Sequence, residues 1–230
     1  FSLSFAQTGS LLQDLAVATV LRRAADEYCD QFGFRDITTH LVYHQWMGAF
    51  PPDPDRATAL IVLSAMNAAL CGADKVVVKT RDEARGIPSI ESNADAVALV
   101  RYVLSHTGAD ARATESAQAV EEEVGRIRSE VDAVMTAVFA LPQSSFLSSV
   151  SSAYETGILD VPFAPHEGNA NLLQTRRGAD GGIYITDPGR VPLPPGCVAR
   201  EMEFAATRRE GGEEPGLFRA LVGDINLMLA

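Results

Sequence analysis

The sequence has few cysteines, and none of them is paired in a recognisable motif. Cys29, Cys71 and Cys197 are the three cysteines among 230 residues, and no CxxC pair occurs. Such spacing argues against both a disulfide framework and a zinc site, so no metal site is predicted. Cys71 lies in an alanine-rich apolar run, which is typical of a small core residue.

Basic residues are also scarce. Thirty Asp and Glu outnumber nineteen Lys and Arg, which gives a formal net charge of -11. No stretch collects enough Lys and Arg to follow a phosphate backbone, so nucleic acid is not an expected partner.

Long apolar runs and targeting signals are absent as well. The run 57–73 is interrupted by Ser64, Asn67 and Gly72, and it falls short of the roughly 20 apolar residues that cross a bilayer. No secretory signal is recognisable at the N-terminus. We therefore expect a cytoplasmic protein without a membrane span. Because the chain opens on Phe1 rather than Met, we expect it to begin within a longer sequence.

The 47% of hydrophobic residues supports a sizeable core, and the first hundred residues repeat one pattern. A β-prone run, a turn and an apolar helical spacing follow one another three times. The predicted strands are 2–6, 34–43 and 73–78, and the predicted helices are 11–28, 57–71 and 94–104.

Successive βα units predict a parallel sheet with right-handed crossovers, in a doubly wound sheet or a TIM barrel. No GxGxxG or GxxxxGK[ST] motif follows a strand, so the barrel is favoured over a nucleotide-binding sheet. A full barrel needs eight units, and this chain supplies three or four. The two open edges of so small a sheet would need strands from elsewhere.

The second part of the chain has a different composition, first rich in serine and then in glycine and proline. A helix is predicted over 117–141, another over 145–154, and a hairpin or bent ribbon around Gly181-Gly182. The predicted fold class is α/β: residues 1–141 form part of a TIM (β/α)8 barrel and residues 142–230 an irregular α+β extension. The charged face of the helix 117–141 is expected to be solvated; it carries Glu121, Glu122, Glu123, Arg126, Arg128 and Glu130.

Polar residues follow each predicted strand, at the end where a parallel barrel carries its catalytic groups. The first strand ends on Gln7-Thr8-Gly9, the second on 44–47 (His-Gln-Trp-Met), and the third on Lys79-Thr80 with Glu83 nearby. These groups are predicted to line one face.

Each of these residues also has a plainer interpretation. His44 is either a general base or an imidazole bonded within its loop. Trp46 and Met47 either shape a pocket floor or cap the core. Lys79 and Glu83 form either a surface ion pair, worth about 0–1 kcal/mol, or a functional pair whose buried ammonium needs an anionic partner. No Ser-His-Asp order, HExxH motif or carboxylate dyad stands out.

Three strings resemble the E subunit of glutamate mutase (methylaspartate mutase). Residues 44–51, HQWMGAFP, resemble its HQWMGGFP loop. Residues 76–94 resemble its VKTxxEAxGxPTxEANA segment, and residues 153–165 resemble its AFEAGVLDVPFAP stretch. The resemblance runs over nearly the whole chain, in the same order, and is weakest after Asn171.

This resemblance implies an isomerase that interconverts L-glutamate and (2S,3S)-3-methylaspartate by a radical mechanism with adenosylcobalamin. It implies a TIM barrel in a heterotetramer, with homodimerisation and a separate small subunit that holds the cobalamin. Lys79 and Glu83 match the positions that contact the adenosyl ribose, and Met47 matches a position at the active site. His44 and Gln45 accompany Met47 as further catalytic candidates.

The sequence also departs from the family. The family's Gly-Gln-Gly-Gly-Asn loop is here residues 6–10, Ala-Gln-Thr-Gly-Ser. The arginines that grip the substrate carboxylates in the family lie before Phe1, so the chain by itself is expected to be inactive as the C-terminal half of the subunit. One alternative is a non-catalytic paralogue or structural partner that retains the barrel fold. Another is a TIM-barrel lyase or aldolase that uses Lys79 as a Schiff-base amine, which the nearby Glu83 disfavours.

Overall fold

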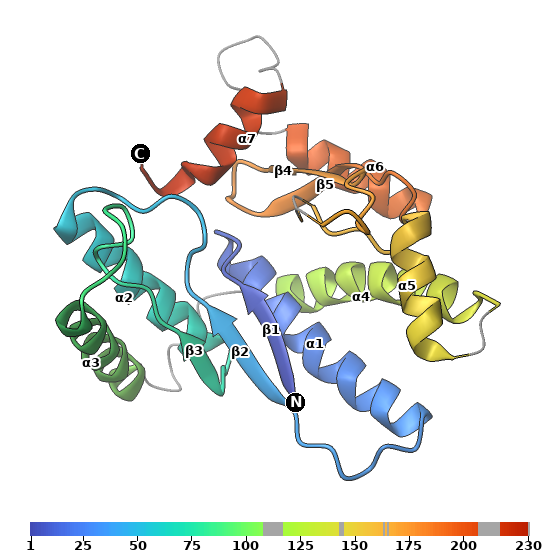
Figure 1. The fold of residues 1–230 in the computed structure, drawn as a ribbon, viewed down its shortest axis with the longest axis horizontal. Coiled ribbons are helices and arrows are strands. Elements are labelled where there is room, and N and C mark those ends of the chain that lie inside the picture. The colour runs from blue at the N-terminus through green and yellow to red at the C-terminus, as the bar shows by residue number, and fades with distance from the viewer. Residues whose placement is uncertain (108–116, 143–144, 163, 165, 207–216, 230) are drawn as a thin grey trace. The chain divides into compact units, whose positions relative to one another are not determined.

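The computed structural model describes residues 1–107, 117–142, 145–162, 164, 166–206 and 217–229 (Figure 1). Two compact units are present. Unit 1 comprises Phe1–Val124 with Leu221–Ala230, and unit 2 comprises Gly125–Ala220. Phe163 and Pro165, in the third family-like string, lie outside the described residues.

Unit 1 is built on a three-stranded parallel sheet in the order β1-β2-β3. The parallel sheet predicted from the βα pattern is confirmed, with Leu3 opposite Leu41 and Tyr43 opposite Val76. The strands are β1 (Ser2–Ala6), β2 (His40–His44) and β3 (Lys75–Val77).

The second strand was predicted too long. It begins at His40 rather than Phe34, and residues 32–38 are exposed. His40 pairs with Ser2, the first residue of β1, and the Thr38 carbonyl accepts the Phe1 ammonium at 2.6 Å, but no strand pairing is described for residues 34–37. A β-prone sequence stays outside a strand when no ladder partner is in reach.

The three predicted helices of unit 1 are present, and each begins after a side-chain cap. Ser10, Asp53 and Ser89 occupy the N-cap positions and accept hydrogen bonds from backbone amides of the first turn. Pro54 opens its helix rather than merely breaking the chain, as proline does at a first helical position. The helices are α1 (Leu11–Gln31), α2 (Pro54–Leu70) and α3 (Ile90–His106).

Helices α1 and α2 pack on the same face of the sheet. Leu41 and Tyr43 alternate along β2 toward this face and are buried with Ala18 of α1 and Ala68 of α2. Cys71 belongs to the same cluster, which confirms it as a core residue, and burial raises the pKa of its thiol. A second cluster lies around α2 and contains Trp46, Phe50, Ala57, Leu60, Ile61, Ala65 and Val100.

Unit 2 contains the predicted hairpin. Strands β4 (Gln174–Arg177) and β5 (Ile183–Asp187) are antiparallel and joined through Gly181-Gly182. The predicted helices are confirmed as α4 (Ala117–Phe139), which begins in unit 1, and α5 (Phe146–Thr156).

Two helices near the C-terminus were not predicted. They are α6 (Pro195–Ala206) and α7 (Leu217–Ile225), the latter followed by a 3-10 turn, Leu227–Leu229. The proline-rich sequence before α6 suggested irregular structure. Pro195 instead occupies the first turn of the helix, where its missing N–H costs nothing.

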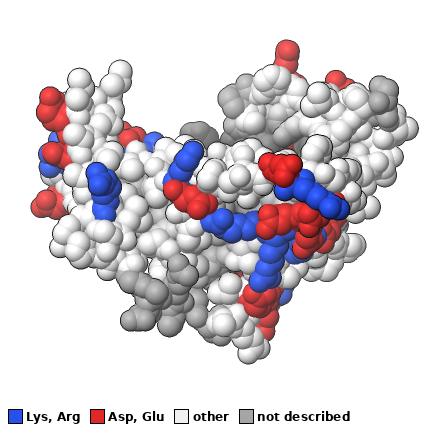
Figure 2. Space-filling model, turned by 90° about the horizontal axis from the view of Figure 1, so that it is seen from below, with Lys and Arg blue, Asp and Glu red and all other residues white. Residues whose placement is uncertain are grey.

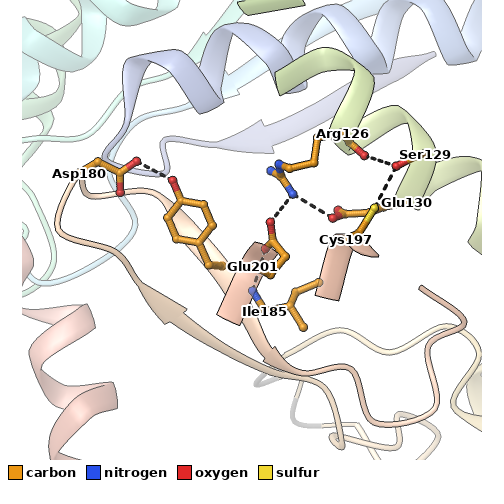
Figure 3. Close-up of polar contacts among 8 residues, drawn as sticks. Arg126, Ser129, Glu130, Asp180, Ile185, Cys197 and Glu201 are labelled. Carbon is orange, nitrogen blue, oxygen red and sulfur yellow. Dashed lines mark hydrogen bonds and ion pairs between the residues drawn. The ribbon is translucent and has the colours of Figure 1, made fainter. Parts of the chain in front are cut away.

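The charged face of α4 is not solvated throughout, because Arg126 is buried. Its side chain points between Glu130 and Glu201, and the Glu201 carboxylate also accepts the Ile185 amide of β5 at 2.8 Å (Figure 3). Arg126 is 8% exposed and Glu201 2%. Helix α6, unforeseen in the sequence, supplies Glu201 and thereby turns a charge predicted to be solvated into an internal ion pair.

Surface charges of unit 1 are partly paired. Arg22 contacts Asp74 at 3.1 Å and Arg23 contacts Glu121 at 2.9 Å. On the face of the molecule in Figure 2, basic and acidic side chains lie next to one another. Within the described ranges, no helix has the length and apolar character that crossing a membrane requires.

Candidate functional site

The carboxyl ends of the three parallel strands meet at one edge of the sheet in unit 1. The backbone N–H of Gln7, directly after β1, donates to the His44 carbonyl at 3.0 Å. The backbone N–H of Gln45, directly after β2, donates to the Val77 carbonyl at 3.3 Å. These bonds hold the three strand ends together, as their place in a parallel sheet predicts.

Lys79 and Glu83 form an ion pair at the end of β3. The Lys79 Nζ lies 3.2 Å from Glu83 Oε2, and the two side chains are 23% and 26% exposed. Glu83 Oε1 accepts the Thr80 amide at 3.3 Å, and the Glu83 amide donates to the Thr80 carbonyl at 3.3 Å. The turn thus fixes the carboxylate, while both charged groups keep part of their surface accessible.

Gln45 is buried beneath this pair. Its Oε1 accepts the Lys79 amide at 2.8 Å, and its Nε2 donates to the Ile61 carbonyl of α2 at 3.1 Å. The side chain is 0% exposed. The structure therefore brings Gln45, Lys79 and Glu83 into one connected group.

His44 and Met47 lie apart from that group. His44 is half-buried at the end of β2, and alternation along the strand places its side chain on the face opposite Tyr43. Met47 is 59% exposed. Among the described residues, no hydrogen bond joins the side chains of His44, Gln45 and Met47.

The loop that carries Met47 is held on both sides of it. Trp46 is buried, and its Nε1 donates to the Ala49 carbonyl at 3.1 Å. The Ala49 amide donates to the Ile225 carbonyl, at the end of α7, at 2.9 Å. A Cβ on Gly48 would lie 2.7 Å from that carbonyl oxygen, so the close approach requires glycine.

A buried polar cluster around Asp14, at the end of β1, was not assigned a role from the sequence. Asp14 is 0% exposed and accepts the Thr8 amide at 2.9 Å, the Thr8 hydroxyl at 2.8 Å and the Tyr43 hydroxyl at 2.9 Å. Burial first, and then the Asp14 carboxylate, raise the pKa of Tyr43 above its usual range. The cluster fastens α1 to the strand ends. An Asp in the first turn of a helix was the signal for it.

Other sites are not apparent in the described part of the chain. No group of three or more His, Cys, Asp and Glu side chains there could hold a metal ion. A shallow surface hollow on α3 is lined by Ala98, Arg101, Tyr102 and Ser105, none of which belongs to the strand ends.

Residues 1–229 match the model of the family described as methylaspartate mutase E chain. This chain belongs to that family. The resemblance seen in the sequence strings is thereby confirmed.

Several relatives named glutamate mutase epsilon subunit are similar over most of the chain. The one from Escherichia coli O157:H7 is 37% identical over 226 residues, which cover 98% of this chain and 46% of that protein. The one from Treponema denticola is 35% identical over 192 residues, 84% of this chain and 39% of that protein. The one from Desulfitobacterium hafniense is 33% identical over 225 residues, 97% of this chain and 46% of that protein. The chain thus spans about half the length of the relatives it matches.

Proposed function

We propose that this chain is part of the catalytic subunit of an adenosylcobalamin-dependent isomerase that interconverts L-glutamate and (2S,3S)-3-methylaspartate. The observation that carries the proposal is the Lys79–Glu83 ion pair at the strand ends of a chain in the methylaspartate mutase E chain family. The relatives' name, glutamate mutase, supports glutamate as the substrate.

We propose a TIM barrel as the architecture of residues 1–141, with residues 142–230 as an extension. Both α1 and α2 cover one face of the sheet. The opposite face carries Ser4, Ala6 and His44 together with Val42 and Val77. A barrel keeps its helices outside and fills its interior from the other face. The outer edges of β1 and β3 would receive further parallel strands from the part of the relatives' length that this chain does not span.

Lys79 and Glu83 fit the adenosyl part of the cofactor. An ammonium and a carboxylate 3.2 Å apart, both partly exposed, supply a donor and an acceptor for the neighbouring hydroxyls of a ribose. The chemistry that adenosylcobalamin supplies when bound is reversible hydrogen-atom abstraction from the substrate. The role of Lys79 and Glu83 would be to hold the ribose in one orientation, because a small displacement of the reacting groups lowers the reaction rate strongly.

The other candidates are given separate roles. Exposed Met47, on a loop held by Trp46 and Ile225, would provide an apolar wall at the mouth of the site. His44, on the face opposite the helices, would face the barrel interior and offer a hydrogen bond to the substrate. Both remain catalytic candidates.

The partners that we propose are a cobalamin-binding small subunit and a second copy of the catalytic subunit. The relatives' designation as an epsilon subunit, which presupposes other subunits, supports the small subunit, and the second copy follows from the family resemblance alone. The small subunit would hold most of the corrinoid, and this chain would contact its adenosyl group.

Reconstitution tests the proposal. The complete protein that contains this chain is mixed with a cobalamin-binding subunit, adenosylcobalamin and L-glutamate, and 3-methylaspartate is measured by chromatography. Product is expected only when all components are present. Absence of product, with the protein folded and the cofactor bound, would refute the reaction.

Substitution of the ion pair tests the assigned residues. Lys79→Ala and Glu83→Ala are each expected to lower kcat/KM by about 10- to 100-fold, because each removes a charge-assisted bond that orients the ribose. Lys75→Ala is the matched control. Lys75 and Lys79 are the only lysines in the sequence, and Lys75 is exposed at the start of the same strand. Equal activity of the Lys75 and Lys79 variants would remove the role assigned to Lys79.

A further inference from the structure

Gln45 points away from the solvent and into the layer between sheet and helices. Leu41 and Tyr43 alternate along β2 toward α1 and α2, and Gln45 continues that alternation one residue beyond the strand. All three side chains are 0% exposed. A fully buried carboxamide in this position has no surface to offer to a bound substrate.

The carboxamide of Gln45 spans two elements. Its oxygen accepts the Lys79 amide at 2.8 Å, and its nitrogen donates to the Ile61 carbonyl at 3.1 Å. Lys79 is the residue whose ammonium contacts Glu83. The buried face of helix α2 is therefore connected through Gln45 to the backbone from which the Lys79 side chain extends.

A second buried amide offers a comparison within the same layer. Gln7 follows β1 and is 4% exposed, and its Oε1 accepts the Ser64 hydroxyl at 2.6 Å. Ser64 lies three residues after Ile61, on the same face of α2. Both glutamines thus tie a strand end to α2, but only Gln45 also holds Lys79.

We infer that Gln45 is a positioning residue that fixes the backbone of Lys79, and through it the Lys79–Glu83 pair, without touching substrate or cofactor. This inference rests on the proposed role of that pair. The sequence predicted a catalytic role for Gln45 because it lies beside His44 and Met47; the inference assigns it a positioning role instead.

The chemistry of the site favours a glutamine. A long neutral side chain that both accepts and donates can bond the Lys79 amide and the Ile61 carbonyl at once. A leucine would leave the Lys79 amide without this acceptor, whereas the Ile61 carbonyl would keep its bond within α2. An ionised glutamate would place a charge in a site without solvent.

The preference of the complex for adenosylcobalamin over methylcobalamin tests the inference, because methylcobalamin lacks the adenosyl group and its ribose. The complete protein is assembled with its cobalamin-binding subunit, and dissociation constants are measured for both cobalamins. Gln45→Asn keeps the amide but is one methylene too short to reach both partners. It is expected to lower the preference about fivefold, the effect of losing one net hydrogen bond.

Gln7→Asn is the matched control, since it shortens a buried side-chain amide that bonds the same face of α2 but has no contact with Lys79. Both variants are expected to lower the melting temperature by similar amounts. Only Gln45→Asn should change the preference. An equal change in both variants, or in neither, would overturn the positioning role, because a general loss of stability would then explain the data.

Lys79→Ala separates the inference from the proposed function. If Lys79→Ala loses the preference and Gln45→Asn keeps it, Gln45 has no positioning role and the cofactor contact stands. If Lys79→Ala keeps the preference, the cofactor contact and the inference both fail.

Hydrogen exchange of the unsubstituted complex covers the case in which Gln45→Asn does not fold. The Lys79 amide should then exchange more slowly than that of exposed Arg81. Equal rates would contradict a fixed Lys79 backbone.

Discussion

Replacing Glu201 with alanine removes an acceptor that two elements of unit 2 share. The Glu201 carboxylate pairs with Arg126 of α4 and accepts the Ile185 amide of β5 at 2.8 Å (Figure 3). Breaking a buried ion pair costs about 3–5 kcal/mol. In the variant, Arg126 would still have Glu130 as a partner at 2.9 Å, and the Glu130 side chain is 15% exposed. We therefore expect Glu201→Ala to lower the stability of unit 2 by about 3 kcal/mol, near the lower limit.

Native-state hydrogen exchange measures this loss where it occurs. Amides of β5 should exchange roughly a hundredfold faster in Glu201→Ala, since about 1.4 kcal/mol corresponds to a factor of ten. Glu203→Ala is the control, because Glu203 lies on the same helix and is exposed. Its effect should stay within about 0.5 kcal/mol. Equal acceleration of β5 exchange in the two variants would refute the buried ion pair as a stabilising element.

Two further predictions concern unit 1. Gly48→Ala should destabilise it by about 1–3 kcal/mol, because the new methyl group meets the Ile225 carbonyl oxygen; thermal unfolding checks this against Gly125→Ala, whose Cβ meets nothing within 4 Å. The Leu41 amide, which donates to the Asp74 carboxylate at 2.7 Å, lowers the pKa of that carboxyl. The stabilisation that the ionised Asp74 carboxylate provides is then fully present above its pKa in the unfolded chain, about 3.9. It is lost as the pH falls through the lower pKa of the folded protein. Asp74→Ala should therefore lower the free energy of unfolding at neutral pH and have no effect in acid. Urea unfolding of both proteins measures this, and a difference between them that does not change with pH would contradict the prediction.

Features that depend on neighbours in the chain could be predicted from the sequence. Helix α1 was recognisable from its apolar spacing, and the Gly181-Gly182 hairpin from its turn residues, because both patterns span only a few residues. The polar groups after each strand were also found, since a strand end is a local feature. The strings around Met47 and Lys79 were long enough to indicate the family.

Features that depend on distant partners required the tertiary structure. The start of β2 at His40 is set by the first residue of β1, and the burial of Arg126 is set by Glu201 on a helix 75 residues further along. Gln45 is the clearest case. Its sequence neighbours suggested a side chain that meets the substrate, whereas its hydrogen bonds to Ile61 and Lys79 turn it inward. Sequence determined which polar residues stand at the strand ends, but only packing against α2 decided that Gln7 and Gln45 are buried and that Gln45 bonds the Lys79 backbone.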